Sequence, residues 1–200
     1  MIIENGKRYA GEDFSCVDLS DALIEGTQFS KCDFGKADLR ELQTYGCVFA
    51  GCGFGGARFN ASVHKNTSFT NCDFEKANLF NAVFNNCKMT GSGFRDTGVS
   101  GLMVVEGDWS YIALRHGNLK ALNLRKVCLK YADLYGSNLE KADLREADLS
   151  CAILQKARLY GADLRGARID GVDFKGIDLS GVRLDIMQAV EIVRSYGAVY

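Results

Sequence analysis

An apolar side chain recurs at every fifth residue through most of this 200-residue chain. Steps of five from Phe14 to Leu184 give 35 positions, and all of them except Thr44 and His64 are apolar. An α-helix repeats its apolar face every 3.6 residues and a half-buried strand every two, so neither element produces this spacing. A fixed short period of this kind is typical of a solenoid built from stacked repeats.

Each of these positions, called a centre from here on, has a regular set of neighbours. The residue two before a centre is mostly small or compact, often Ala or Cys, and the residue directly before it is often Asp or Asn, as residues 132–150 show. On an extended segment, a centre and the residue two before it point the same way. The following pair turns the chain, and the recurring glycines there tolerate unusual φ angles. The sequence therefore predicts an all-β solenoid with centres and small partners inside.

The pattern over residues 14–184 resembles the pentapeptide-repeat family. The resemblance implies a right-handed quadrilateral β-helix, in which four successive repeat units close each coil. The chain contains no proline, which agrees with coils joined by backbone hydrogen bonds. We expect an N-terminal cap over residues 1–13, a single β-helix domain over 14–184, and a short C-terminal helix with a tail over 185–200.

Two regions depart from the simple repeat. Residues 2–9 contain Asn5 and Gly6, which favours a small hairpin that covers the open edge of the first coil. In the middle of the chain, Leu102 and Ile112 stand where small partners are expected, and this predicts a bulge or bend.

The C-terminal segment has the pattern of a short helix. Asp185 is a candidate N-cap, Gln188 follows three residues later, and Gly197 stands where such a helix would end. The helix would carry one apolar face, which must be buried on the last coil or on a second copy of the chain. The residues of this face, our predicted dimer interface, are Ile186, Ala189, Val190 and Val193.

No catalytic, cofactor or metal site is predicted. Cys32, Cys52 and Cys72 occupy the small-partner position of every fourth unit, so they should fill the interior as a column. Such a column does not converge on one point as the four ligands of zinc do. His64 is a centre and should be an interior, hydrogen-bonded side chain beside Thr44. Outward-facing positions are expected for Cys16, Cys128 and Cys151.

Composition limits the possible functions further. The chain has 24 basic and 25 acidic residues, so its net charge of −1 gives no global attraction to nucleic acid. No apolar run reaches the roughly 18 residues that span a membrane, and the N-terminus lacks the apolar stretch of a signal peptide. We therefore expect a cytoplasmic protein that binds neither a membrane nor nucleic acid directly, in a compartment that keeps its eight cysteines reduced.

Local charge and outward apolar side chains leave two interpretations open. A rod with regularly spaced carboxylates can present a DNA-like field to a DNA-binding protein, although Arg125, Arg145 and Arg165 form a basic ladder on one wall. Alternatively, outward apolar residues form a protein-binding stripe. The residues of this stripe are Leu23, Val63, Val83 and Met103, with Tyr45 and Val105 adjacent.

Two further segments resemble one group within the family, the Qnr and MfpA proteins. These are residues 107–115, GDWSYIALR, and residues 184–199, LDIMQAVEIVRSYGAV. The resemblance implies a non-enzymatic cytoplasmic homodimer that mimics DNA, binds DNA gyrase or topoisomerase IV, and protects it from quinolones. The carboxylates that we predict to contact this partner are Asp133, Asp143, Asp148, Asp163, Asp173 and Asp178. The competing hypothesis is a scaffold that binds another protein through the apolar stripe.

Overall fold

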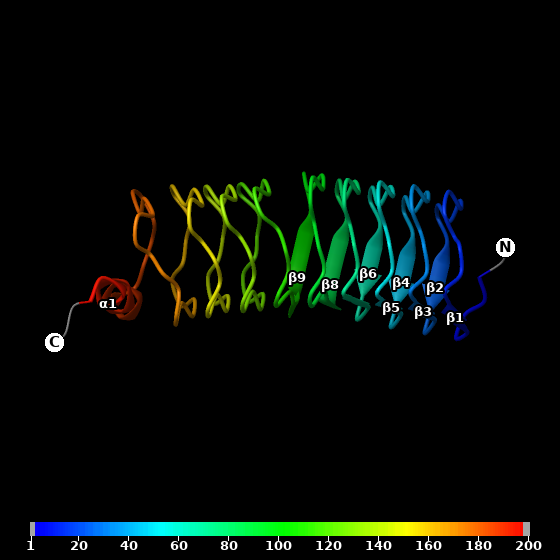
Figure 1. Ribbon diagram of the computed structural model, residues 1–200, viewed down its shortest axis with the longest axis horizontal. Coiled ribbons are helices and arrows are strands. Elements are labelled where there is room, and N and C mark those ends of the chain that lie inside the picture. The colour runs from blue at the N-terminus through cyan, green and yellow to red at the C-terminus, as the bar shows by residue number, and fades with distance from the viewer. Residues whose placement is uncertain (1–2, 198–200) are drawn as a thin grey trace.

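The computed structural model describes residues 3–197, so Ile2 of the expected hairpin and residues 198–200 of the expected tail lie outside the described part. Within residues 3–197 the chain forms nine short strands and one helix, arranged as a rod with the two ends of the chain at opposite ends (Figure 1). The elements are β1 (Arg8–Ala10), β2 (Leu23–Glu25), β3 (Gln28–Ser30), β4 (Gln43–Tyr45), β5 (Val48–Ala50), β6 (Val63–Lys65), β7 (Ser68–Thr70), β8 (Val83–Lys88), β9 (Met103–Asp108) and α1 (Ile186–Ser195).

Successive coils pair in parallel, each residue with its counterpart one coil later, and this gives the rod four walls. The bridging residues of wall 1 are 13, 33, 53, 73, 93, 113, 133 and 153, and those of wall 2 are 18, 38, 58, 78, 98, 118, 138 and 158. Wall 3 contains 23, 43, 63, 83, 103, 123, 143, 163 and 183, and wall 4 contains 8, 28, 48, 68, 88, 108, 128, 148 and 168. The predicted β-solenoid with one C-terminal helix is confirmed.

The centres point inward and form the core. Phenylalanine centres one coil apart form an aromatic column, with Phe34 and Phe54 stacked at 5.2 Å between ring centroids and Phe54 and Phe74 at 5.0 Å. A second column, which includes Phe49 and Phe69 at 4.8 Å, meets the first edge to face. Beyond Trp109 the buried centres are mostly leucines.

The turns repeat as strictly as the core. From residue 6 to residue 181, every fifth residue has a positive φ angle, and most of these residues are not glycine. Lys and Asn are common there, for example Lys76 at 57° and Asn81 at 56°. The turn position therefore does not require glycine, which explains why the glycine period is visible only in the last units of the sequence.

The prediction of an N-terminal hairpin is wrong for the described residues. Strand β1 pairs in parallel with β3, and the Tyr9 ring stacks on Phe29 at 5.3 Å. Gly6 donates its backbone N–H to the Glu25 carbonyl of the next coil. Tyr9 stands five residues before Phe14 and acts as a further centre, so the solenoid begins before residue 14.

The expected bend is present, between the coil that contains β9 and the next one. Bridges Gly93–Ala113 on wall 1 and Asp108–Cys128 on wall 4 are kept, whereas on walls 2 and 3 no bridge joins 98 to 118 or 103 to 123 within the described chain. The coils thus separate on two walls as a wedge. Leu102 and Leu122 are buried at successive small-partner positions of wall 3, and their bulk accounts for the opening.

The interior polar groups behave as the sequence indicates. His64 is fully buried, with Nδ1 2.7 Å from Thr44 Oγ1 and Nε2 3.0 Å from Ser62 Oγ. Burial lowers the pKa of His64 to about 3.

All eight cysteines are free thiols. Cys32, Cys52 and Cys72 are buried as expected, Cys16 and Cys151 are exposed, and Cys128 is half-buried. In residues 3–197 no group of three or more His, Cys, Asp or Glu side chains is arranged to hold a metal ion. None of the helices described is long and apolar enough to cross a membrane.

Candidate interaction surfaces

The Asp or Asn directly before a centre has a structural task in the turn. Its Oδ1 accepts the backbone N–H two residues later, at 3.1 Å from Asp143 to Arg145 and 2.8 Å from Asp13 to Ser15. The same contact occurs with asparagine, from Asn123 to Arg125. These side chains therefore have a structural role in the turn, which does not depend on whether their charge contributes to partner binding.

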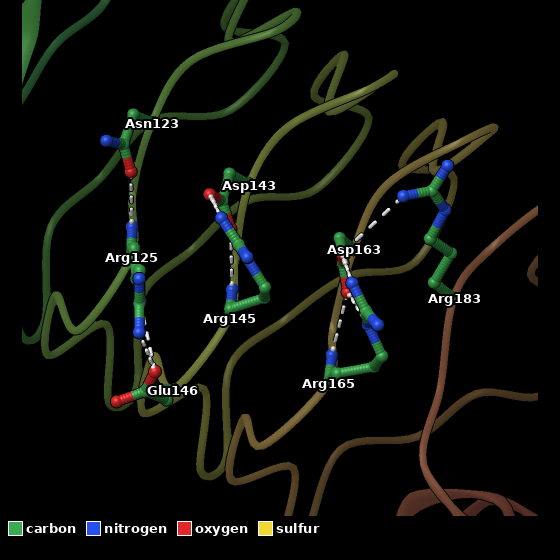
Figure 2. Close-up of polar contacts among 8 residues, drawn as sticks. All are labelled: Asn123, Arg125, Asp143, Arg145, Glu146, Asp163, Arg165 and Arg183. Atoms are coloured by element: carbon green, nitrogen blue, oxygen red, sulfur yellow. Dashed lines mark hydrogen bonds and ion pairs between the residues drawn. The ribbon is translucent and has the colours of Figure 1, made fainter.

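On the C-terminal half of wall 3 these aspartates also bind arginines (Figure 2). The Arg145 guanidinium donates to both carboxylate oxygens of Asp143, at 2.8 and 2.6 Å, and Arg165 binds Asp163 in the same way at 2.9 and 2.6 Å. The hydrogen bonds from Arg165 are the main reason that the pKa of Asp163 falls to about 2. The predicted basic ladder is thus a ladder of paired charges.

The first arginine of this ladder has a different partner from the other two (Figure 2). Arg125 follows Asn123, which has no charge, so its guanidinium binds Glu146 of the next coil instead. Arg183 lies 3.9 Å from Asp163 and leaves most of its side chain in solvent. A shallow groove of about 580 Å³ runs beside the ladder, and four cations and two carboxylates line it: Lys141, Arg145, Arg165 and Arg183 with Asp143 and Asp163.

The six predicted partner-binding aspartates do not form one acidic wall. Asp143 and Asp163 are bridge partners on wall 3, whereas Asp133 is on wall 1 and Asp148 on wall 4. The twenty-residue register assigns Asp173 to wall 1 and Asp178 to wall 2. Four of the six have an ion-pair partner: Asp133 with Arg115, Asp143 with Arg145, Asp148 with Lys130 and Asp163 with Arg165. Asp173 and Asp178 are exposed and have no ion pair within residues 3–197.

Charge is distributed unevenly along the rod. Residues 1–112 contain 14 acidic and 10 basic side chains, and residues 113–200 contain 11 acidic and 14 basic ones. The first coils are the most acidic, with eight acidic and three basic residues over 12–41. Of those eight, Asp38 has ion pairs, to Arg40 and Arg58.

The predicted apolar stripe consists of the first residues of the strands on wall 3. Parallel pairing of the strands places these residues in register on β2, β4, β6, β8 and β9: Leu23, Gln43, Val63, Val83 and Met103. Leu23 and Met103 at its ends are 52% and 54% exposed. Gln43 interrupts the stripe between Leu23 and Val63.

The C-terminal helix α1 is capped as expected. Asp185 accepts the backbone N–H of Gln188, and the Gln188 side chain accepts the backbone N–H of Asp185, both at 3.0 Å. The helix docks on the last coils through Gln188 and Ile192, which are 3% and 6% exposed. Gln188 Nε2 also donates to the carbonyls of Leu164 and Ala167.

The predicted dimer residues lie mainly away from this docking face. Ile186 is 81% exposed and Val193 is 52% exposed, Ala189 is exposed, and Val190 is half-buried. Sequence reasoning considered Gln188 only as a capping residue and did not include Ile192. Their spacing of four residues was the available signal, because residues i and i+4 share a helix face.

Comparisons with known proteins agree with this architecture. A family model described as pentapeptide repeats matches in eight copies, over residues 13–51, 65–96, 128–166 and 142–181. The matched segments omit residues 97–127, where the wedge lies. No curated protein sequence matches the chain.

Three solved structures show the likeness in fold. A trypsin-treated variant of QnrB1, a plasmid-mediated fluoroquinolone resistance protein, is 23% identical with a TM-score of 0.85, covering 97% of this chain and 99% of that one. Full-length QnrB1 is 22% identical with a TM-score of 0.72, covering 98% and 99%. HetL, involved in heterocyst differentiation regulation in the cyanobacterium Nostoc sp. strain PCC 7120, is 22% identical with a TM-score of 0.64, covering 89% and 88%.

Proposed function

Because the chain belongs to the pentapeptide-repeat family, we propose that it is a non-enzymatic homodimer that binds DNA gyrase in place of DNA and protects it from quinolones. Topoisomerase IV is the second candidate target. The observation that carries the proposal is a solenoid rod that ends in a helix with an outward apolar face. A rod of this fold, over nearly the same length, is found in QnrB1, which is described as a fluoroquinolone resistance protein.

The dimer is proposed to join two rods end to end through α1. Ile186 and Val193 are apolar and largely solvent-exposed, while the opposite face is already docked on the last coils. A ten-residue helix is marginal alone in water, so docking on the solenoid holds this face in place for a partner copy.

The dimer has a direct test. We expect Val190→Glu, Val193→Glu, or truncation after Leu184 to yield monomers, because a charge at the joint is costly to bury. Sedimentation velocity measures the change, with Glu191→Gln on the helix flank as the control. A dimer that survives both glutamate substitutions would contradict this joint.

The electrostatic part of the proposal rests most on carboxylates that have no ion pair within residues 3–197. Asp173 and Asp178 are such carboxylates near α1, close to the proposed joint. An exposed carboxylate contributes weakly and is screened by salt, so single neutralisations should matter little. Several reversals together should matter, because the field of a surface is a sum over its charges.

Purified gyrase tests this proposal. The dimer should restore supercoiling in the presence of a quinolone. Reversal of Asp163, Asp173 and Asp178 to Lys should abolish binding, whereas the matched Asn triple variant, which keeps the Oδ1 acceptors, should weaken it less. Affinity is measured at two salt concentrations for folded dimers. Unchanged binding of the Lys variant would reject the acidic surface.

The apolar stripe on wall 3 supports the second candidate, a scaffold for another protein. Leu23 and Met103 are exposed at opposite ends of this stripe. An apolar interface should keep its affinity as salt rises, whereas an electrostatic mimic should lose affinity steeply. Leu23→Lys combined with Val63→Lys would weaken the scaffold interaction and leave gyrase binding unchanged.

A further inference from the structure

The wedge leaves backbone groups without partners on both of its sides. In the regular stack an N–H donates to a carbonyl of the next coil, as from Leu79 to Gly98 at 2.7 Å. One coil onward, the N–H groups of Asp96, Val99 and Gly101, which should donate to the next coil, have no backbone hydrogen bond within the described chain. On the other side of the wedge, the N–H groups of Asn118 and Asn123, which should donate to the preceding coil, have none either.

Unpaired backbone groups in a β-structure normally find another partner. Here they line two strand-like edges that face each other across walls 2 and 3, while walls 1 and 4 remain hydrogen-bonded. On wall 3 the opening is a groove of about 260 Å³. Residues of both coils line it, Val104, Val105 and Glu106 from one and Asn123, Arg125 and Lys126 from the next.

The side chains beside the groove indicate which kind of ligand would bind there. Met103 and Val105 are 54% and 44% exposed on one side. Arg125 and Lys126 stand on the other side, and Lys126 Nζ lies 3.8 Å from Glu106 Oε1. Arg125 is also hydrogen-bonded to Glu146, so the groove offers apolar surface next to two exposed cations that can exchange their present carboxylate partners for those of a ligand.

We propose that this wedge is a docking slot for an extended segment of a partner protein, in which β-branched apolar residues alternate with Asp or Glu. The backbone of the segment pairs with the open edges, as in strand addition to a sheet. Its apolar side chains cover Met103 and Val105, and its carboxylates approach Arg125 and Lys126. The slot is separate from α1 and from the surface proposed for gyrase, so it goes beyond that function.

A tryptophan beside the wedge provides an intrinsic fluorescence signal for ligand binding. Trp109 is the single tryptophan and stands next to the hydrogen-bonded side of the wedge. Its ring is buried, and Nε1 has no hydrogen-bond partner in the described structure. A small interior cavity, which Leu102 and Leu122 also line, lies beside it. Movement of the two coils should therefore change its fluorescence.

Amide hydrogen exchange tests the open edges first. In the free protein the amides of Asp96, Val99 and Gly101 should exchange much faster than those of Lys76, Leu79 and Asn81, the equivalent residues one coil earlier. Equal protection of the two sets would mean that the coils are closed in solution, and it would overturn the proposal.

A blocked peptide of alternating valine and glutamate tests the slot itself. Its binding should change Trp109 fluorescence and slow exchange at the open amides. The carbonyls that these N–H groups would reach in a closed stack, such as those of Asn118 and Lys120, also accept no backbone hydrogen bond within the described chain. A peptide with the same side chains and N-methylated backbone should bind about tenfold more weakly, because it cannot donate to these carbonyls. A valine–lysine peptide should also bind more weakly.

The protein variants complete this test. Val105→Glu should weaken binding of the valine–glutamate peptide, because it removes apolar surface and adds a like charge, and Leu23→Glu, on the same wall away from the wedge, should not. Equal binding of the N-methylated peptide would overturn backbone pairing. Failure of the unmodified peptide to slow exchange would overturn the slot.

Discussion

The two halves of the rod share one backbone path but differ in how they are filled. All the strands described lie in the part of the chain up to Asp108 (Figure 1). In this part phenylalanine rings stack along the axis of the rod. Beyond it, residues 113–183 continue the stack through single bridges, such as Asn123–Asp143, over a core of Leu and Ala. Rings stacked near 5.0 Å match the spacing of neighbouring strands. The coil therefore accepts either core, provided that one large side chain faces inward in each unit.

The surfaces of the two halves differ more than their cores. The first coils keep most carboxylates without ion pairs, whereas the C-terminal half of wall 3 pairs each aspartate with an arginine two residues later. The half that we predicted to be the acidic mimic is thus the better neutralised one. Carboxylates without ion pairs in residues 3–197 include most of those over residues 12–41, near one end, and Asp173 and Asp178, near the other.

The largest effect should come from the aromatic core. Phe54→Ala should lower the free energy of unfolding by about 3–5 kcal/mol, and Leu144→Ala by about 2–5 kcal/mol, through lost burial and a cavity. Phe54 also loses ring contacts to Phe34 and Phe74. Urea denaturation measures both. A cost at either position as small as that of Lys65→Ala, below about 1 kcal/mol, would mean that the inward face is assigned wrongly.

A second difference between the halves is how their stability depends on pH, because the buried histidine, His64, lies in the first half. Its pKa is lowered to about 3 by burial, so it stays neutral in the folded state while the unfolded chain takes up a proton near pH 6.5. The unfolded state then binds more protons, and stability falls as pH falls from about 6.5 toward 3, by at most about 1.4 kcal/mol per pH unit.

His64→Phe is the variant that isolates this effect, since it keeps a ring in the column with Phe84. Urea denaturation between pH 7 and pH 5 should show a shallower dependence on pH than in the parent protein. The same slope in both proteins would show that His64 is not the group responsible.

Much of this fold could be predicted from the sequence, because one inward side chain in five residues fixes the register of every coil. The capping of α1 followed in the same way from Asp185 and Gln188. The anchoring of α1 through Ile192 could not be predicted, since it depends on where the helix lies on the last coil. The pairing of Asp143 with Arg145 was within reach, because residues two apart on an extended segment point the same way.

The N-terminal hairpin failed for a related reason. Asn5 and Gly6 favour a tight turn, but Gly6 has the positive φ that every unit needs at this position. The turn signal of a hairpin and that of a coil are the same in these residues. Tyr9, five residues before Phe14, was the feature that distinguished them.

The smallest effects should come from the charged ladder, and they separate the structural task of an aspartate from its charge. Arg165→Ala should cost less than about 1 kcal/mol, because exposed ion pairs contribute little. Asp163→Ala should cost about 1 kcal/mol or somewhat more, since the backbone N–H of Arg165 loses its acceptor. Asp13→Ala in the other half should cost a similar amount, although Asp13 accepts from Ser15 without any arginine. Asp163→Asn, which keeps Oδ1, should be nearly neutral. If Asp163→Ala proved much costlier than Asp13→Ala in urea denaturation, the ion pair rather than the turn would be the source of its stability.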